Sequence, residues 1–336
     1  MIIVMKNNAS EKSKNYVMNK LNEIGINYNI TNIKDKLIIC CTDYDKIKHG
    51  DISFLKRNKD VVNLIDISSS NKLVYKNENK LKTIINIDDV RIGADELVLI
   101  AGPCAVESKE QIKETAHFIK EHNAKILRGG IFKPRTSPYS FSGIGLKGLE
   151  YIKEACEETG LKNVCEVLDI SDISAMKDYV DIFQVGTRNM YNYPLLKELG
   201  KRDKPVLLKR ALSGSVEEWL MSAEYILLEG NHNVMLCERG IRTFNTYTRN
   251  TLDISVVPYI KTISHLPVIV DPSHAAGIHN LVPPLAMASV SAGADAVMIE
   301  VHSQPDKSLS DSEQTISLQE YAKISGQLLE IKKLLE

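Results

Sequence analysis

A regular alternation of apolar strands and amphipathic helices begins at residue 97, and it is the feature that most constrains the fold. Eight apolar segments recur, and they lie at 97–101, 125–128, 163–168, 181–185, 205–209, 233–237, 267–270 and 296–301. Helical stretches separate them, among them 109–121, 146–159, 216–228, 285–291 and a long one from residue 318. Eight strand–helix units linked by right-handed crossovers are typical of a (β/α)8 barrel.

A doubly wound open sheet is the alternative fold. Such sheets usually have fewer strands, and they need a glycine-rich phosphate-binding turn after the first strand. Here the first strand is followed by Gly102-Pro-Cys104, which is not such a turn. The sequence therefore favours the barrel.

The first 67 residues follow a different pattern. A strand at 2–5 precedes a helix that Ser10 can cap and that Gly25 ends. Val17, Leu21 and Ile24 fall on one face of this helix. Strands at 26–31 and 36–42, a helix at 43–59 and a strand at 61–67 complete a βαββαβ order. This order predicts a small ferredoxin-like domain.

A polar stretch at 68–80 separates the two patterns, and a short hairpin at 83–87 and 90–92 follows it as a plug or cap for the barrel. We therefore predict three parts: a ferredoxin-like domain at 1–68, a linker at 69–80, and a barrel with its N-terminal hairpin at 81–336. A chain of 336 residues is long enough for one barrel and one small domain.

Composition excludes several classes of protein. Lys and Arg number 42 and Asp and Glu 43, so no bulk charge attracts nucleic acid or a membrane surface. The six cysteines form no CxxC pair, and neither a signal peptide nor an apolar run of about 18 residues is evident. We expect a cytoplasmic enzyme with reduced thiols.

The carboxyl ends of the strands are where a barrel of this kind places its active site. Cys104, His274 and Glu300 follow or end the first, seventh and eighth strands, which are neighbours in a closed barrel. Sulfur, imidazole and carboxylate donors together suit a divalent ion such as Zn²⁺, Mn²⁺, Fe²⁺ or Co²⁺. The loop after the eighth strand offers a fourth ligand, and the candidates are, in order of preference, Asp311, then Asp306 and His302.

Cations follow most of the other strands. Any one of them alone is more simply a solvated surface residue, but together they would repel one another unless an anion binds. They are Arg128, Lys133, Arg135, Arg188, Lys209, Arg239 and Arg242. This pattern predicts a metal-dependent barrel enzyme for phosphorylated, polyanionic substrates.

Five motifs together resemble the 3-deoxy-D-arabino-heptulosonate 7-phosphate (DAHP) synthases, in the branch with an N-terminal ferredoxin-like regulatory domain. They are Ala101-Gly-Pro-Cys104, Leu127-Arg-Gly-Gly-Ile-Phe-Lys-Pro-Arg-Thr-Ser-Pro138, Leu207-Leu-Lys-Arg210, Cys237-Glu-Arg-Gly-Ile-Arg242 and Asp271-Pro-Ser-His274. The resemblance implies condensation of phosphoenolpyruvate with erythrose 4-phosphate and water, which gives DAHP and phosphate at the start of the shikimate pathway.

The resemblance also assigns residues. It implies that the metal ligands are Cys104, His274, Glu300 and Asp311. It implies that phosphoenolpyruvate is held by Arg128, Lys133, Arg188, Lys209 and Arg239. It implies that erythrose 4-phosphate is held by Lys133, Arg135, Thr136 and Ser137.

The implied reaction is an aldol-like condensation in which C3 of phosphoenolpyruvate attacks the aldehyde, water adds at C2 and phosphate leaves. The metal would act as a Lewis acid on the aldehyde. Catalytic roles fall to Lys209, Glu166 and Lys133. Glu166 and Lys209 are expected to position the water and move its proton, because a carboxylate beside cations stays ionised and a crowded lysine releases a proton readily.

The resemblance further implies feedback by an aromatic amino acid, such as tyrosine or phenylalanine, bound between paired small domains of a homo-oligomer, a dimer or a tetramer. Where relatives place a His and a Ser for the effector, this chain has Asn29 and Thr31. Both side chains can form hydrogen bonds.

Three other functions are possible for such a barrel. The sister 3-deoxy-D-manno-octulosonate 8-phosphate synthases share the Gly-Pro-Cys and Asp-Pro-Ser-His motifs but differ at the segment that starts at Lys133. A metal-dependent aldolase would not need so many cations, and a catalytically silent barrel would not need the complete set of metal ligands.

Overall fold

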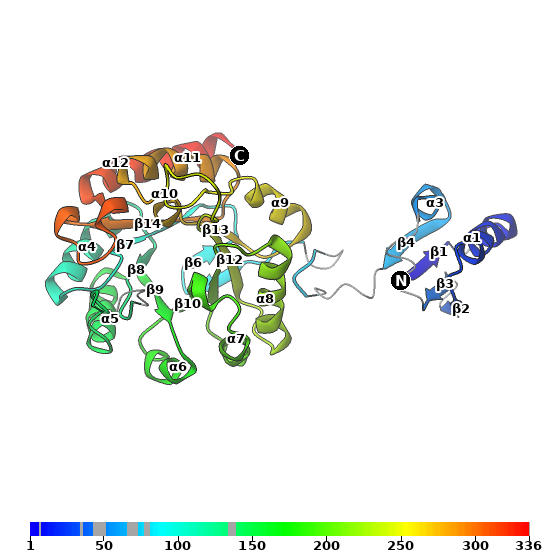
Figure 1. The fold of residues 1–336 in the computed structure, drawn as a ribbon, viewed down its shortest axis with the longest axis horizontal. Coiled ribbons are helices and arrows are strands. Elements are labelled where there is room, and N and C mark those ends of the chain that lie inside the picture. The colour runs from blue at the N-terminus through cyan, green and yellow to red at the C-terminus, as the bar shows by residue number, and fades with distance from the viewer. Residues whose placement is uncertain are drawn as a thin grey trace. The chain divides into compact units, whose positions relative to one another are not determined.

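The computed structural model describes residues 1–6, 8–33, 36–42, 52–65, 73–76, 81–133 and 139–335. The chain divides into two compact units, Met1–Ser70 and Asn71–Glu336 (Figure 1). Each unit has its own hydrophobic core.

The N-terminal unit contains one antiparallel sheet with the strand order β2-β3-β1-β4. Its elements are β1 (Ile2–Met5), α1 (Glu11–Glu23), β2 (Tyr28–Ile33), β3 (Lys36–Cys41), α3 (Ser53–Arg57) and β4 (Val61–Ile65). This order and topology confirm the predicted ferredoxin-like arrangement. Residues 43–51 of the helix predicted at 43–59 lie outside the described residues, and its described helical part is α3.

Helix α1 begins and ends as its sequence predicts. The Ser10 hydroxyl accepts a hydrogen bond from the Ser13 amide at 3.2 Å, and Gly25 ends the helix at a φ of +69°. Val17 and Leu21 are fully buried, where they join Ile3 and Ile39 of the sheet in the core of the unit.

The second unit is a closed barrel of eight parallel strands surrounded by helices, as predicted (Figure 1). Its strands are β7 (Val98–Gly102), β8 (Ile126–Arg128), β9 (Lys162–Val167), β10 (Ile182–Val185), β11 (Val206–Lys209), β12 (Val234–Glu238), β13 (Val268–Val270) and β14 (Ala296–His302). Pairing of β13 with β14 and of β14 with β7 closes the barrel. A short strand, β15 (Ile316–Ser317), pairs with the end of β14.

The helices of this unit lie outside the strands. They are α4 (Lys109–Glu121), α5 (Lys147–Thr159), α6 (Ile170–Met176), α7 (Tyr193–Gly200), α8 (Val216–Leu228), α9 (Val256–Ile263), α10 (Pro272–Ala276), α11 (Val282–Ser291) and α12 (Leu318–Leu334). Four 3₁₀ turns, η1 (Thr187–Asn189), η2 (His279–Leu281), η3 (Pro305–Lys307) and η4 (Ser312–Gln314), lie in the loops. Helix α11 begins three residues before the predicted start, at Val282.

The barrel has two apolar layers. Inside it, side chains such as Ile100, Leu207 and Met298 pack against those of the hairpin β5 (Ile85–Ile87) and β6 (Val90–Ile92). Outside it, alternate strand residues pack against the helices, and Trp219 of α8 is fully buried there with its indole donating to the Leu208 carbonyl. Because both faces of each strand are covered, the strands are apolar nearly throughout.

Part of the predicted linker packs on the barrel. Val74 is fully buried, and the buried Glu224 carboxylate on α8 accepts hydrogen bonds from the amides of Leu73 and Val74. Tyr75 forms a bridge with Ser264. The apolar triplet Leu73-Val74-Tyr75 explains this difference, since it interrupts an otherwise polar stretch.

Gly102 allows β7 and β8 to approach each other beneath Cys104. Its φ is +145°, and a Cβ at this position would overlap the carbonyl oxygen of Arg128. We expect Gly102→Ala to lower the free energy of unfolding by about 2–5 kcal/mol, from backbone strain plus the clash. Urea denaturation would measure the loss. Gly230→Ala is the control, since φ at Gly230 is also positive but a Cβ there would meet nothing within 4 Å. An equal loss of unfolding free energy in both variants would show that the clash at Gly102 contributes nothing.

Candidate active site

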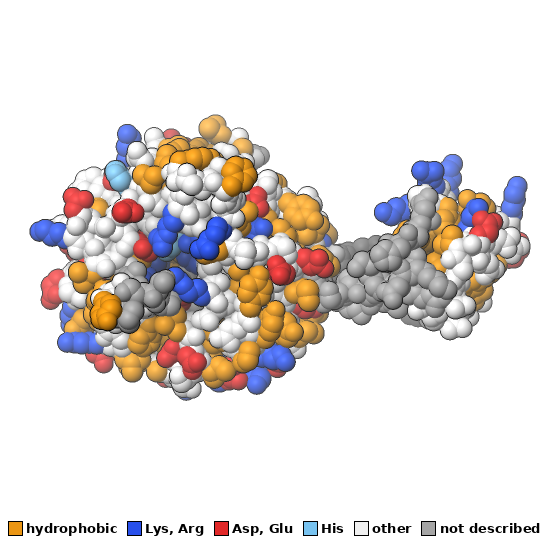
Figure 2. Space-filling model, viewed as in Figure 1, with side chains coloured by type: hydrophobic (Ala, Val, Ile, Leu, Met, Phe, Trp, Pro, Cys, Tyr) orange, Lys and Arg blue, Asp and Glu red, His pale blue; other side chains and the backbone are white. Residues whose placement is uncertain are grey.

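A cavity of about 510 Å³ opens at the carboxyl ends of the barrel strands. Its lining combines acidic and basic side chains with one histidine, and in the space-filling view Lys and Arg gather in the hollow at the middle of the barrel unit (Figure 2). Among the described residues, the predicted site residues that line it are Lys133, Glu166, Arg188, Lys209, Arg239, Arg242, His274 and Asp311.

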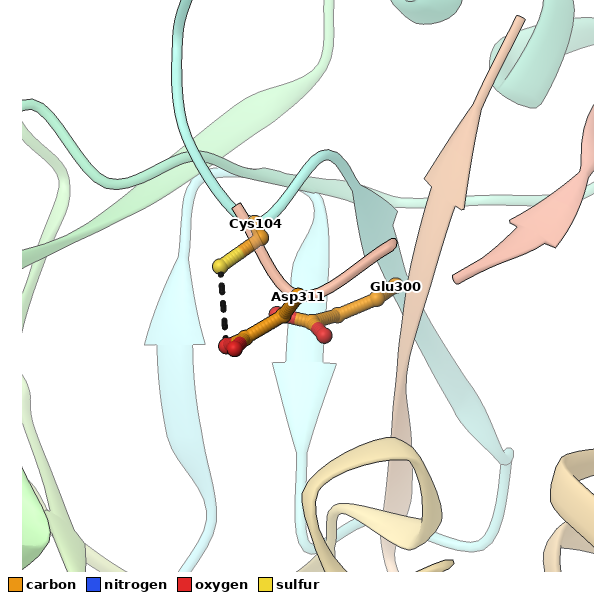
Figure 3. A group of neighbouring side chains, drawn as sticks. All are labelled: Cys104, Glu300 and Asp311. Atoms are coloured by element: carbon orange, nitrogen blue, oxygen red, sulfur yellow. Dashed lines mark hydrogen bonds between the residues drawn. The ribbon is translucent and has the colours of Figure 1, made fainter. Parts of the chain in front are cut away.

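Three of the four predicted metal ligands form a tight cluster at one side of this cavity. One donor atom from each of Cys104, Glu300 and Asp311 lies within 4.8 Å of the others. The Cys104 thiol donates to Asp311 Oδ2 at 3.2 Å, and Figure 3 shows the three side chains converging from the loop after β7, from β14 and from the loop after β14. Asp311 adopts the left-handed backbone conformation, with a φ of +53°, which Asp tolerates better than most residues.

His274, the fourth predicted ligand, faces the same cluster. Its Nε2 lies 3.4 Å from Glu300 Oε1 and 3.7 Å from Asp311 Oδ2. Its Nδ1 lies 2.7 Å from the buried Asp271 carboxylate, which also caps helix α10 by accepting from the His274 amide. A histidine held through Nδ1 by a carboxylate presents Nε2 in a fixed direction, as metal-binding histidines do.

The lesser candidates do not join the cluster. His302 is buried, its Nδ1 accepts from the Gln304 amide, and its Nε2 lies 3.5 Å from Glu107 Oε2. Asp306 is exposed on turn η3. Of the three candidates for the fourth ligand, Asp311 alone lies within this cluster.

Burial and neighbouring charges shift the pKa values of the cluster. Burial, together with the Glu300 carboxylate, raises the pKa of the Cys104 thiol to about 12. Burial also lowers the pKa of His274, although the carboxylates of Asp271 and Glu300 oppose this shift. For Asp311, burial alone would raise the pKa, but the charges of His274 and Arg249 hold it well below its usual range.

Many of the site's cations are paired with acidic residues. Arg128 Nη1 donates to Glu300 Oε1 at 2.5 Å, and Lys209 Nζ donates to Asp271 Oδ2 at 2.6 Å. Lys133 Nζ lies 3.0 Å from the Cys104 sulfur. In the described part of the chain, by contrast, Arg188, Arg239 and Arg242 form no salt bridge, so their charge faces the cavity.

The remaining predicted residues divide between those that the structure describes and those that it does not. Arg135, Thr136 and Ser137 lie outside the described residues. Asn29 and Thr31 are exposed on β2 of the N-terminal unit. Arg128 is buried and does not line the cavity.

Glu166 lies on β9 at the cavity wall, where Gln184 donates to its Oε2 at 3.4 Å. Gly186 lies against it, because a Cβ at position 186 would overlap Glu166 Oε1. The backbone of Gly186 has a φ of −69° and a ψ of 161°, which alanine also adopts. The absence of a side chain at 186 therefore makes room for the Glu166 carboxylate.

We expect Gly186→Ala to displace the Glu166 carboxylate and lower turnover by about 10-fold or more, if Glu166 moves a proton in the reaction. Steady-state kinetics would measure this effect. Gly326→Ala on α12, where a Cβ meets nothing within 4 Å, is the matched control. Unchanged turnover in Gly186→Ala would show that the position of Glu166 does not matter.

Sequence reasoning missed three residues of the site. Asp271 is visible in the Asp-Pro-Ser-His motif, but its spacing to His274 does not show that it also pairs with Lys209. Arg249 and Gln314 lie in loops away from the strand ends, where no periodic signal exists. Both contact the acidic cluster, since Arg249 donates to Asp311 and Gln314 donates to Glu300.

The fold and the site define a barrel enzyme whose cation-lined cavity opens beside a Cys/His/carboxylate cluster. Comparison with known proteins narrows this class. The DAHP synthetase I family matches residues 67–336, which shows that the chain belongs to this family. It is therefore an enzyme of the 3-deoxy-7-phosphoheptulonate synthase type, in a family that belongs to the shikimate pathway.

Individual relatives agree. A phospho-2-dehydro-3-deoxyheptonate aldolase of Thermotoga maritima is 42% identical over 99% of this chain and 97% of its own length. The crystal structure of the Thermotoga maritima DAHP synthase superposes with a TM-score of 0.79, at 40% identity, over 99% of this chain and 97% of that one. A 2-dehydro-3-deoxyphosphooctonate aldolase of Caulobacter vibrioides is 32% identical over 71% of this chain and 89% of its own length.

In the part of the chain that the structure describes, no helix has the length and apolar character needed to cross a membrane.

Proposed function

We propose that the chain condenses phosphoenolpyruvate with erythrose 4-phosphate and water to give DAHP and phosphate, and that it does so with one divalent metal ion. This proposal rests on two features that lie together at the carboxyl ends of the barrel strands. A cluster of sulfur, imidazole and carboxylate donors lies beside a cavity lined by cations. The first suits a divalent ion, and the second suits two phosphorylated substrates.

The donors fit a metal of this kind. Cys104, Glu300 and Asp311 lie within one coordination sphere of each other, and His274 presents Nε2 to the same point. Mn²⁺, Fe²⁺, Zn²⁺ and Co²⁺ all accept such a mixed set. When bound, the ion would polarise the aldehyde carbonyl as a Lewis acid.

The cations would hold the substrates. Phosphoenolpyruvate is assigned to Lys133, Arg188, Lys209 and Arg239, which line the cavity, and to Arg128, whose buried Nε has no hydrogen-bond partner among the described residues. Erythrose 4-phosphate is assigned to Lys133 and to the segment with Arg135, Thr136 and Ser137. Holding both anions together turns a bimolecular encounter into a positioned one.

Glu166 and Lys209 are assigned to the water that adds at C2. Both line the cavity, Glu166 on β9 and Lys209 on β11 two strands away. A carboxylate and an ammonium group on opposite sides of one water can take and return its proton as phosphate leaves. Full turnover in Glu166→Gln would refute this role.

The experiment that tests the proposal follows phosphate release from phosphoenolpyruvate. Erythrose 4-phosphate and arabinose 5-phosphate are compared as acceptors, each with and without chelator. We expect release with erythrose 4-phosphate, its loss on chelation, and its return when a divalent metal is restored. Release with arabinose 5-phosphate alone would instead favour the octulosonate phosphate synthase reaction.

Coverage of the relatives favours the heptulosonate reaction. The octonate relative of Caulobacter covers 71% of this chain, whereas the heptonate relative covers 99%, which includes the N-terminal unit. A protein that shares the whole chain is the better guide to function than one that shares the barrel alone.

Regulation is assigned to residues 1–68, joined to the barrel at 69–80. An aromatic amino acid would bind at exposed side chains of β2, Asn29 and Thr31, between paired units of a homo-oligomer, a dimer or a tetramer. We also propose a cytoplasmic location, which agrees with the six cysteines, since none of them forms a disulfide in the described part of the chain. Titration with tyrosine and phenylalanine, followed by activity and sedimentation, tests the regulation; no change in either would exclude that amino acid.

A further inference from the structure

We propose that Gln314 is a positioning residue, which fixes the orientation of two acidic metal ligands by bonding to Glu300 directly and to Asp311 through Arg249. The inference rests on the proposed metal site. Gln314 lies at the end of turn η4, three residues after Asp311, and its side chain is 1% exposed.

The contacts form a continuous chain across the site. Gln314 Nε2 donates to Glu300 Oε2 at 2.5 Å, and Gln314 Oε1 accepts from Arg249 Nη1 at 2.9 Å. The same Arg249 Nη1 donates to Asp311 Oδ1 at 3.2 Å. Each carboxylate thus has one oxygen held by this chain of contacts. Its other oxygen faces the cluster, since Glu300 Oε1 and Asp311 Oδ2 lie 3.4 and 3.7 Å from His274 Nε2. Glu300 Oε1 also accepts from Arg128 Nη1, so Gln314 shares the positioning of Glu300 with Arg128.

Arg249 is itself held in place. Its amide donates to the Ala276 carbonyl, and the following residue, Asn250, donates from its side chain to the His274 carbonyl. Gly277 packs against the Arg249 side chain, so closely that a Cβ at 277 would overlap it. The loop that carries Arg249 is therefore fixed to the helix that carries the histidine ligand.

The contacts require a side chain at position 314 that both donates and accepts, and an amide does so from two separate atoms. A carboxylate oxygen only accepts and a guanidinium group only donates, so the residue between them must do both. Glutamate would place a second carboxylate against Glu300, and methionine would remove both hydrogen bonds while keeping the size of the side chain. Outer residues that orient metal ligands typically contribute 10- to 100-fold to metal affinity.

The test compares Gln314→Met with the wild-type enzyme and with Asn231→Leu. Asn231 is a matched control, since it is also a buried amide side chain that bridges two groups. It lies outside the site and donates to the backbone carbonyls of Leu199 and Lys204. Each full-length protein is freed of metal with a chelator and titrated with Co²⁺, and the thiolate-to-metal absorption gives the affinity directly. Activity at limiting and at saturating Co²⁺ is the second measurement.

We expect Gln314→Met to bind Co²⁺ about 10- to 100-fold more weakly than wild type, and to recover most of its turnover at saturating Co²⁺, since all four ligands remain. Asn231→Leu should lose stability but keep the affinity. Wild-type affinity in Gln314→Met would overturn the positioning role alone. Failure of the wild type to bind Co²⁺ would overturn the metal site, and this inference with it.

A double substitution tests whether the contacts act as one chain. The double variant carries both Gln314→Met and Arg249→Met. If the two residues act through each other, its loss of Co²⁺-binding free energy will be smaller than the sum of the losses in the two single variants. Additive losses would show that Arg249 and Gln314 act separately, and would overturn the indirect connection to Asp311.

Discussion

Replacing Cys104 with alanine is expected to remove the bound metal ion and to lower turnover by about 1,000-fold or more. Metal catalysis of this type stabilises transition-state charge by several kcal/mol, and each 1.4 kcal/mol corresponds to a tenfold change in rate. Cys104 supplies the one sulfur donor of the cluster and is 1% exposed. Metal content after dialysis and steady-state kinetics would measure the two effects.

Cys165→Ala is the matched control for this prediction. Cys165 is also 1% exposed, but it packs in the outer apolar layer of the barrel rather than in the cluster. Its replacement is expected to cost stability and to leave metal content unchanged. Retention of the metal and of turnover in Cys104→Ala would rule out thiolate ligation and leave Cys104 as a small buried side chain.

The Cys104 thiol is also expected to lose its proton when the metal binds, and the number of protons released can be measured. Burial raises the pKa of Cys104 to about 12, so in the metal-free protein the group is a thiol that donates to Asp311. A metal binds the thiolate, and binding must therefore release a proton near neutral pH. Calorimetry in buffers of different ionisation enthalpy would count that proton, and the count should fall in Cys104→Ala.

The sequence predicted the cluster because strand periodicity locates residues that follow strands. Cys104, His274 and Glu300 come from adjacent strands of a closed barrel, so their approach follows from strand order alone. Arg249 and Gln314 could not be predicted this way, because they lie in loops whose paths depend on tertiary packing. The pairing of Asp271 with Lys209 likewise depends on which side chains face each other across β11 and β13.

The predicted cations show a similar limit. Position along the strands placed Arg128 at the barrel mouth, but only the structure shows that its partner is Glu300 and that it is buried rather than part of the cavity lining. Lys209 and Arg210 are adjacent in sequence, yet Lys209 lines the cavity while Arg210 lies over the Trp219 ring and pairs with Glu238. Charge at the strand ends therefore predicted a cavity lined by cations, but not the contacts of each residue.

Replacing Arg128 with methionine is expected to destabilise the metal-free protein by about 3–5 kcal/mol, because it leaves the fully buried Glu300 carboxylate without its cation. Burial alone would raise the pKa of Glu300, but the charges of His274 and Arg128 hold it below its usual value. A divalent ion would supply positive charge at the same carboxylate. The loss should therefore be smaller in the metal-loaded enzyme.

Urea denaturation of the chelated and the metal-loaded protein would measure this difference. Arg210→Met provides the matched comparison, since Arg210 is also buried and pairs with the buried Glu238 at 3.0 Å, away from the proposed ligands. It should destabilise both forms equally. Equal losses from Arg128→Met in both forms would show that the metal does not compensate for the missing guanidinium.

The stability of Arg128→Met with and without metal also predicts whether this variant binds the metal more tightly or more weakly. If Arg128→Met costs less stability in the metal-loaded form, the thermodynamic cycle requires the folded variant to bind the metal more tightly by the same free energy. Turnover should nevertheless fall, because Arg128 is also assigned to phosphoenolpyruvate. Gln314→Met should do the opposite, since a neutral amide orients Glu300 without competing for its charge. Arg128 and Gln314 both contact the Glu300 carboxylate. If their replacement changes the metal affinity in opposite directions, Arg128 acts on Glu300 through its charge and Gln314 acts by orienting it.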